Sequence, residues 1–314
     1  MRQLSIAVAQ FEPKDGDKEY NLTVIEELTR KAKESGADII SFHEMSITAY
    51  THCKNLTRTE LETLAENVQG KSTDKLISIS EQYDIPVLAG LVEIDEGKIY
   101  NTYICVDKSG VIARYRKIHP FISQYMSAGS EYIVFNLKNW KCGILICYDN
   151  NVIENVRATS LMGAEIIFAP HVTMCTPSPM PGRGYVADEF WQNRYSNPDQ
   201  LRKEFDGPKG REWLMRWLPA RAYDNGVFYV FTNPIGYDGE HLKNGNSMII
   251  DPYGEVLTEI KSFENTIQLA TVTEDKLTLA GGYRYKKARK PALYKDILGE
   301  ENQSVTKPTW MENN

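Results

Sequence analysis

The sequence predicts an α/β fold in which helices cover β-sheets. Short apolar stretches with strand-like alternation recur along the chain, beginning with LSIAVAQF at residues 4–11. Stretches with helical spacing lie between many of them, and the first has apolar residues at Leu22, Ile25, Leu28 and Ala32. Of the 314 residues, 42% are hydrophobic and 25% charged, as is typical of a globular protein. Alternating strands and helices indicate sheets with helices packed against them.

The other elements follow from the same two periodicities. Gly36 ends the first helix, and helices are expected at 58–66 and 72–83, the latter capped by Ser72 or Thr73. Two apolar stretches joined by DEGK indicate a hairpin. Further helices are expected at 152–162 and 213–226, and strands at 37–44, 85–94, 99–107, 111–118, 132–137, 142–148, 164–170, 227–233, 246–252 and 266–272.

Two segments fall outside this pattern. Residues 172–210 are rich in Pro, Gly, Arg and aromatic residues, with poor periodicity. Such a long irregular segment is either a lid and contact segment or a surface loop. The basic stretch from Leu279 onward lacks a clear apolar period and either packs on a partner subunit or forms a loose surface tail. We therefore divide the chain into one domain over 1–275 and a C-terminal extension over 276–314.

Composition limits the classes of partner. The net charge is −6 and the pI about 5.6, which argues against nucleic acid and anionic membranes as partners. No stretch approaches the roughly 20 apolar residues of a membrane span. The N-terminus has no apolar core and cleavage site of a signal peptide, so we expect a cytoplasmic protein. The five cysteines are an odd number at scattered spacings, which favours free thiols over disulfides or a metal site.

Cys147 is the cysteine with a candidate chemical role. It closes the apolar stretch CGILIC and directly precedes a predicted helix. Main-chain amides at such a position favour a thiolate and can bind an oxyanion. Cys142 opens the same stretch, and an odd separation places the two thiols on opposite faces of a strand. We therefore assign Cys142 to packing, whereas Cys147 is either packed or nucleophilic.

A nucleophilic thiol needs a base and a positive partner. Glu44 ends the stretch IISFHE, and Lys117 ends the stretch RYRK. Each could equally be an ordinary charge at the end of a strand. His119 and His171, each near a strand end, could instead pair with the cysteine, and neither is marked out by its spacing.

A family resemblance distinguishes these alternatives. The stretches FHEMSITAY, YRKIHPF and GILICYDNN, in this order, resemble the glutamate, lysine and cysteine motifs of the nitrilase, or carbon–nitrogen hydrolase, superfamily. Further matches are YNTYICVDKSG, RAYDNGVFYVFTN and NSMIIDPYGEVL, so the resemblance runs from the first strand to about residue 273. Each motif alone is weak, and the ordered combination is specific.

The resemblance implies a four-layer αββα sandwich and a homodimer. It assigns Glu44 as general base, Cys147 as nucleophile and Lys117, with the main-chain N–H of Tyr148, as oxyanion stabiliser. The substrate is then a small molecule with a C–N bond, and neither a metal nor an organic cofactor is required. Tyr50 fits the aromatic position of the glutamate motif.

The substrate is less well defined by the sequence. Many relatives have a second glutamate about seven residues after the lysine, and counting from Lys117 reaches Gln124, while Glu131 fits a different position. Asn150 either lines the pocket or caps a helix, and His171 either contacts substrate or is a satisfied strand-end histidine. Residues of the 172–210 segment that could cover the cleft are Met180, Arg183, Tyr185, Phe190 and Trp191.

Three functions remain open at this point. We expect a hydrolase of a small linear amide or N-carbamoyl compound. A true nitrilase would use the same three residues. A weakly active binding or regulatory protein that keeps the fold is the alternative of another class.

Overall fold

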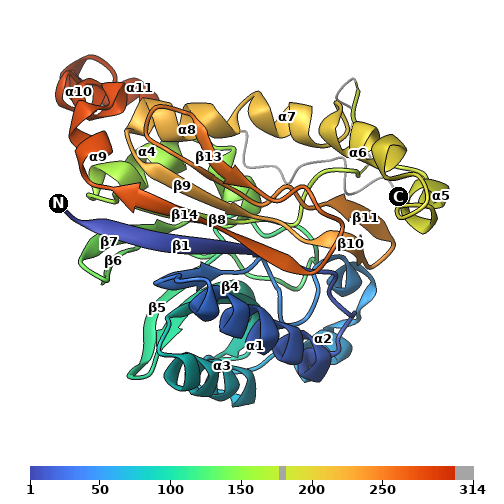
Figure 1. Cartoon of the computed structure of the whole chain (residues 1–314). Helices are drawn as coiled ribbons and strands as arrows, with labels where there is room; N and C mark the ends of the chain where they lie inside the picture. The colour runs from blue at the N-terminus through green and yellow to red at the C-terminus, as the bar shows by residue number, and fades with distance from the viewer. Residues whose placement is uncertain (177–181, 301–314) are drawn as a thin grey trace.

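The structure, a computed structural model that describes residues 1–176 and 182–300, consists of two sheets packed face to face with helices on both outer sides (Figure 1). The strands of the first six-stranded sheet, in spatial order, are β14 (Thr266–Thr273), β1 (Gln3–Gln10), β2 (Ile39–Ser41), β3 (Val87–Asp95), β4 (Lys98–Asp107) and β5 (Gly110–Arg116). Those of the second are β13 (Val256–Glu259), β12 (Met248–Ile250), β9 (Phe228–Thr232), β8 (Ile166–Pro170), β7 (Trp140–Ile144) and β6 (Val134–Leu137).

Helices close the sandwich on both sides. The first sheet carries α1 (Lys18–Glu34) and α3 (Lys71–Tyr83), and the second carries α4 (Ile153–Leu161) and α8 (Leu218–Asn225). A buried apolar cluster joins α1 and α3 to the first sheet, and a larger one fills the space between the sheets and beneath α8. The four-layer αββα arrangement is therefore confirmed.

The central strands of both sheets run parallel, which brings several strand ends to one edge of each sheet. Strands β1, β2 and β3 run parallel, as do β7, β8 and β9. Carboxyl ends of parallel strands meet at one edge of a sheet, where polar side chains from distant parts of the sequence can come together. The segments that follow β2, β7 and β8 therefore lie close to one another.

Several element boundaries differ from the sequence-based expectation. The strand expected over 142–148 ends at Ile144, and the helix expected from residue 72 begins at Lys71 with Gly70 as its N-cap. Ser72 lies inside the first turn, where its N–H and hydroxyl donate to Glu66. The side chain of Glu66 thus takes over the role expected of a capping hydroxyl.

The 172–210 segment contains regular structure. It includes α5 (Asp188–Gln192) and α6 (Pro198–Asp206), and α7 (Arg211–Met215) follows directly. The expectation of an irregular segment is wrong here because these helices are short, so few apolar positions reveal their period. Met180 lies outside the described residues.

Other elements complete the chain. The hairpin β10 (Ile235–Asp238) and β11 (His241–Asn244) was not expected from the sequence. The remaining short elements are η1 (Thr51–Asn55), α2 (Arg58–Leu64), η2 (Cys147–Asn150), α9 (Asp275–Leu279), α10 (Gly281–Lys287), η3 (Pro291–Leu293) and α11 (Lys295–Leu298). Among the described residues, no helix is long and apolar enough to span a membrane.

The C-terminal extension begins by packing on its own chain. Helix α10 crosses α8 at two glycines, and a Cβ on Gly282 would lie 2.1 Å from the main-chain nitrogen of Gly226. Tyr223 and Tyr285 meet at the same crossing with their hydroxyls 3.2 Å apart. Packing of the extension on a partner subunit stays a prediction.

Candidate active site

Glu44 lies just beyond β2, in a turn that a glycine makes possible. Gly90 of β3 passes so close that a Cβ there would lie 2.3 Å from the main-chain nitrogen of Met45. Met45 itself has a positive φ of 48°. The close approach fixes the main chain that carries Glu44, whose side chain is completely buried.

Glu44 and Lys117 form a buried ion pair. Lys117 Nζ donates to Glu44 Oε1 at 2.6 Å, and both side chains are fully buried. Asn101 Nδ2 donates to the same oxygen at 2.6 Å, and the main-chain N–H of Val172 donates to Oε2 at 3.1 Å. A buried carboxylate is tolerated when it is paired and hydrogen-bonded in this way.

Cys147 lies beside this pair in a strained turn. It follows β7 by three residues and adopts a positive φ of 46°, which is unusual for a residue with a side chain. Its thiol donates to the main-chain carbonyl of Val172 at 3.9 Å. Val172 therefore binds Glu44 through its N–H and Cys147 through its carbonyl, and so links two of the three predicted catalytic residues.

Burial and two charges act on the Cys147 thiol. Burial is the main cause that raises its pKa to about 12, the Glu44 carboxylate adds to the rise, and the Lys117 ammonium opposes it. Burial alone would lower the pKa of Lys117, but the neighbouring Glu44 outweighs this effect and raises it. At neutral pH the resting site therefore contains a neutral thiol beside a charged lysine.

Asp149 ties the cysteine turn to the lysine loop. Its buried carboxylate accepts from the N–H of His119 at 2.9 Å, from the N–H of Ile118 at 3.2 Å and from the hydroxyl of Tyr115 at 2.9 Å. The ring Nδ1 of His119 lies 2.8 Å from the same carboxylate. The sequence did not single out Asp149, although a buried acidic residue two positions after a nucleophile is a usable signal.

Asn150 supports the turn and does not line the cavity. Its side-chain amide donates to the carbonyls of Leu145 and Cys147, at 2.7 and 3.0 Å, and its oxygen accepts from Tyr229. Asn151, the next residue, borders the cavity instead. Of the two sequence-based alternatives for Asn150, the structural role is the one that its contacts support.

A cavity of about 420 Å³ opens onto Cys147. Its walls combine aromatic, apolar, polar and cationic side chains: Tyr50, Thr51, Lys54, Phe121, Ile122, Cys147, Tyr148, Asn151, Val172, Thr173, Met174, Thr176, Arg183, Trp213, Trp217, His241 and Lys243. A volume of this size suits a small organic molecule. Tyr50 and Tyr148 are thus at the cavity, as the sequence predicted, and so is Arg183 of the 172–210 segment.

Other sequence-predicted residues lie elsewhere. Gln124 and Glu131 are exposed and do not line the cavity, and the residues of that loop that do are the apolar Phe121 and Ile122. His171 is buried against Phe231 and Trp217, and burial lowers its pKa to about 3. Its Nδ1 lies 2.7 Å from the carbonyl of its neighbour Ala169, so its surroundings are those of a structural histidine.

Two other histidines, His43 and His119, also contact groups other than the Cys147 thiol. His43 is buried with its ring 4.7 Å from that of Phe11, and its Nδ1 lies 3.0 Å from the Glu44 carbonyl oxygen. His119 pairs with Asp149. Neither lines the cavity, so Glu44 is the basic group beside Cys147.

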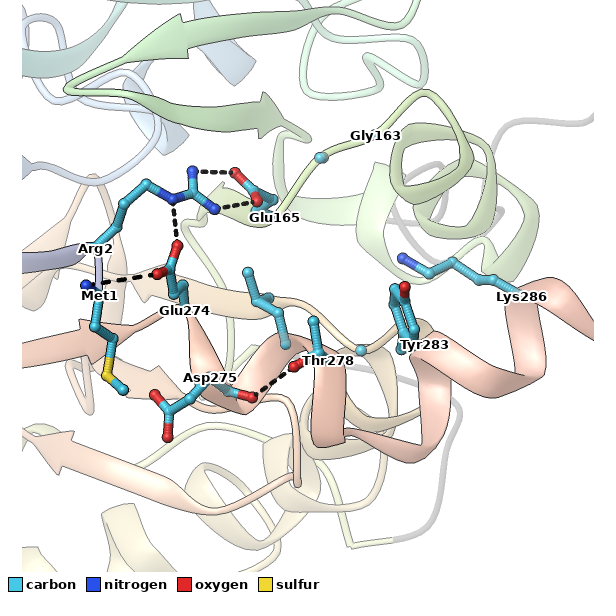
Figure 2. Close-up of a pocket in the computed structure, with 12 residues that line it drawn as sticks. Met1, Arg2, Gly163, Glu165, Glu274, Asp275, Thr278, Tyr283 and Lys286 are labelled. Atoms are coloured by element: carbon cyan, nitrogen blue, oxygen red, sulfur yellow. Dashed lines mark hydrogen bonds and ion pairs between the residues drawn. The ribbon is translucent and has the colours of Figure 1, made fainter.

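A second, larger cavity of about 580 Å³ lies near the N-terminus (Figure 2). Arg2 there forms ion pairs with Glu165 and Glu274 at 2.7 Å each, and Lys286 donates to Ser160 at 2.9 Å. These cations already have partners, and no cysteine lines this cavity. The chemistry therefore belongs to the smaller cavity.

Comparison with known proteins gives a family match for the chain. The family model for carbon–nitrogen hydrolases matches residues 5–280. An (R)-stereoselective amidase of Pseudomonas sp is 28% identical over 82% of this chain and 80% of its own, and a nitrilase of Pyrococcus abyssi is 25% identical over 86% and 89%. A 2-oxoglutaramate amidase of Bacillus subtilis is 27% identical over 81% and 85%.

Solved structures give the same answer for the fold. The amidase from Nesterenkonia sp. AN1, in a mutant form complexed with acrylamide, matches with a TM-score of 0.69 and 19% identity over 94% of this chain and 97% of that one. At this identity the likeness speaks for the fold alone. From the family match, the chain belongs to the carbon–nitrogen hydrolases of the nitrilase superfamily.

Proposed function

We propose that this enzyme hydrolyses the C–N bond of a small amide or N-carbamoyl compound through a thioester on Cys147. The observation that carries the proposal is the buried Glu44–Lys117 pair beside the Cys147 thiol at a cavity wall. Two of the relatives are named as amidases, which supports the same class of reaction.

In the first half-reaction, Glu44 takes the thiol proton as sulfur attacks the carbonyl carbon of the substrate. Because the pKa of Cys147 is about 12, the proton leaves during attack and not beforehand. Lys117 and the main-chain N–H of Tyr148 stabilise the negative oxygen that forms. Glu44 then gives its proton to the leaving nitrogen, and the C–N bond breaks to release ammonia or an amine.

In the second half-reaction, Glu44 takes a proton from water, and the hydroxide attacks the thioester carbon. The C–S bond breaks, the acid leaves, and the sulfur regains a proton from Glu44. Each half-reaction returns Glu44 to its carboxylate form, so one base serves both steps. Asp149 holds the loop after Lys117 against the turn of Cys147 throughout.

Ammonia release tests the proposal. Purified protein is incubated with panels of short amides, N-carbamoyl compounds and nitriles, and acid-quenched samples are analysed by mass spectrometry for an acyl group on Cys147. Turnover of an amide or carbamoyl compound, with the acyl mass on Cys147, is the expected result. Cys147→Ala should abolish both signals, whereas Cys142→Ala, which removes a thiol packed in the core, should retain turnover.

The other outcomes have definite meanings. Turnover of nitriles alone would identify a nitrilase, as one relative is named. Turnover of none of the three panels, with Cys147 unmodified, would contradict the proposal and favour the binding-protein alternative. A homodimer and a cytoplasmic location, both expected from the sequence, stay predictions. Light scattering in solution measures the oligomeric state.

A further inference from the structure

The cavity beside Cys147 has an unbalanced positive charge. Its lining includes Lys54, Arg183 and Lys243, and no Asp or Glu. Cations in a cavity of low dielectric attract an anionic ligand strongly. Whether a cation is available to a substrate therefore depends on whether the protein already pairs it with an acidic group.

Lys54 is the cation with a direct partner, since its Nζ lies 3.3 Å from Glu240. Lys243 is 2% exposed, and its only hydrogen bond among the described residues is a long one, 3.5 Å, to the carbonyl of Met174. Asp238 acts on Lys243 from a distance and is not within ion-pair range of it. Burial lowers the pKa of Lys243, and its amino group has donors that no described residue uses, so an anion bound there would favour its charged form.

Arg183 has even less negative charge near it than Lys243. The acidic groups near enough to favour its charge are the thiols of Cys147 and Cys175, and no carboxylate acts on it among the described residues. Its guanidinium lies 5.3 Å from the ring centre of Trp213, and its Nε is buried without a hydrogen-bond partner in the described part of the chain. An arginine held in this way presents its planar donors to a carboxylate.

Three further polar atoms on residues that line the cavity are buried and unpaired among the described residues: Tyr50 Oη, Trp217 Nε1 and His241 Nδ1. Burial and the charge of Lys243 lower the pKa of His241 to about 4, so its ring is neutral at pH 7. Buried polar atoms usually have partners in a folded protein. Hydroxyl and imidazole groups beside two cations suit an oxygen-rich anion.

We propose that the substrate carries a carboxylate on the side of the molecule away from its amide or carbamoyl group, and that Arg183 and Lys243 bind this carboxylate. The inference rests on the proposed function for the identity of the reacting group. Arg183, Lys243 and Cys147 all line the same cavity of about 420 Å³, so one small molecule can reach the thiol and both cations together.

Matched substrates test the charge. Succinamic acid is compared with butyramide, and N-carbamoyl-β-alanine with propylurea, since each pair differs in its terminal carboxylate and shares its reacting group. The ratio of kcat/KM for the anionic over the neutral compound should exceed about 10, and Arg183→Gln or Lys243→Gln should lower it about tenfold or more. A preference within the first pair indicates an amide substrate, and a preference within the second pair indicates a carbamoyl substrate.

Arg216→Gln is the matched control. Arg216 also lies over Trp213, at 5.0 Å, but it does not line the cavity and pairs with Glu212. This variant should leave the ratio unchanged. A ratio near 1 in the unaltered protein, or the same fall in Arg216→Gln as in Arg183→Gln, would overturn the proposal while leaving the hydrolase intact.

A binding measurement separates this inference from the catalytic one. Calorimetry with Cys147→Ala protein, which cannot form the thioester, compares succinamic acid with butyramide at equilibrium. Tighter binding of the anion that is lost in the double variant with Arg183→Gln supports the carboxylate site even if no turnover is found. Equal or absent binding of both compounds refutes it whatever the hydrolase assay gives.

Discussion

Replacing Glu44 by glutamine should separate two effects of this carboxylate, namely its stabilisation of the buried ion pair and its influence on the acidity of the Cys147 thiol. In the buried pair, Oε1 accepts from Lys117 and Asn101 and Oε2 accepts from the N–H of Val172. A glutamine keeps one oxygen, and its NH₂ group must face a donor. The best arrangement leaves the N–H of Val172 without an acceptor and the buried ammonium without an anion, which costs about 3–5 kcal/mol of unfolding free energy.

The same change should make the thiol more acidic. Glu44 is the second cause of the raised pKa of Cys147, after burial, and Lys117 opposes both. Removing a nearby like charge lowers such a pKa, and an effect of ordinary size increases the thiolate fraction about tenfold or more at pH 8. Hydrolysis should nevertheless be lost, because the variant lacks the base proposed to serve the leaving group and the water.

The assay is the rate of iodoacetamide alkylation at Cys147 against pH, followed by mass spectrometry, together with ammonia release and urea unfolding. The inflection of the rate profile should move to lower pH in Glu44→Gln. Glu93→Gln is the control, since it removes another buried carboxylate of the first sheet, bonded to Thr102 and Arg116, without lining the cavity. An unmoved inflection, or retained hydrolysis, would refute the assignment of Glu44 as the charge and base at the thiol.

Three further changes have expected outcomes. Asp149→Asn should lower kcat/KM and cost about 1–3 kcal/mol in urea unfolding, because an amide cannot accept all the bonds of the carboxylate and leaves a main-chain N–H unpaired; unchanged kinetics would show that this link does not position the site. Gly90→Ala should cost about 1–3 kcal/mol, since its methyl would lie 2.3 Å from a main-chain nitrogen, and an unaltered urea midpoint would contradict the close approach. The unfolding free energy should decrease as the pH falls from 6.5 to 4. Burial lowers the pKa of His43 and of His241 to about 4 and that of His171 to about 3, so these three rings take up protons on unfolding. Burial raises the pKa of Asp238 to about 6, which opposes the effect and leaves about two protons, or about 2.7 kcal/mol per pH unit near pH 5; His171→Gln should flatten this slope in urea titrations, and an equal slope would contradict the assigned cause.

The three residues proposed as catalytic could be located from the sequence because each follows a strand with a clear apolar pattern. Strands β2, β5 and β7 precede Glu44, Lys117 and Cys147, and the sandwich brings these chain ends together. Strand periodicity survives folding because it records which side chains are buried. The resemblance then assigned roles that position alone left open.

The cavity walls could not be predicted in the same way. Counting along a loop led to Gln124, but a loop has no fixed period, and the residues of this loop that line the cavity are Phe121 and Ile122. His241 and Lys243 belong to a four-residue strand of mixed polarity, whose pattern resembles a surface loop. Their burial results from tertiary contacts, for which a single sequence carries little signal.

The cysteine turn shows that one step of the sequence-based argument does not apply to the folded chain. Cys142 does pack in the core, but strand parity cannot separate it from Cys147, because β7 ends at Ile144. What sets Cys147 apart is its positive φ, a conformation that costs roughly 1–2 kcal/mol for a residue with a side chain. Asn150 helps to offset that cost by binding the carbonyl of Cys147 itself. Asn150 therefore shapes the turn of Cys147, and the cavity beside that turn is lined largely by residues from distant parts of the chain.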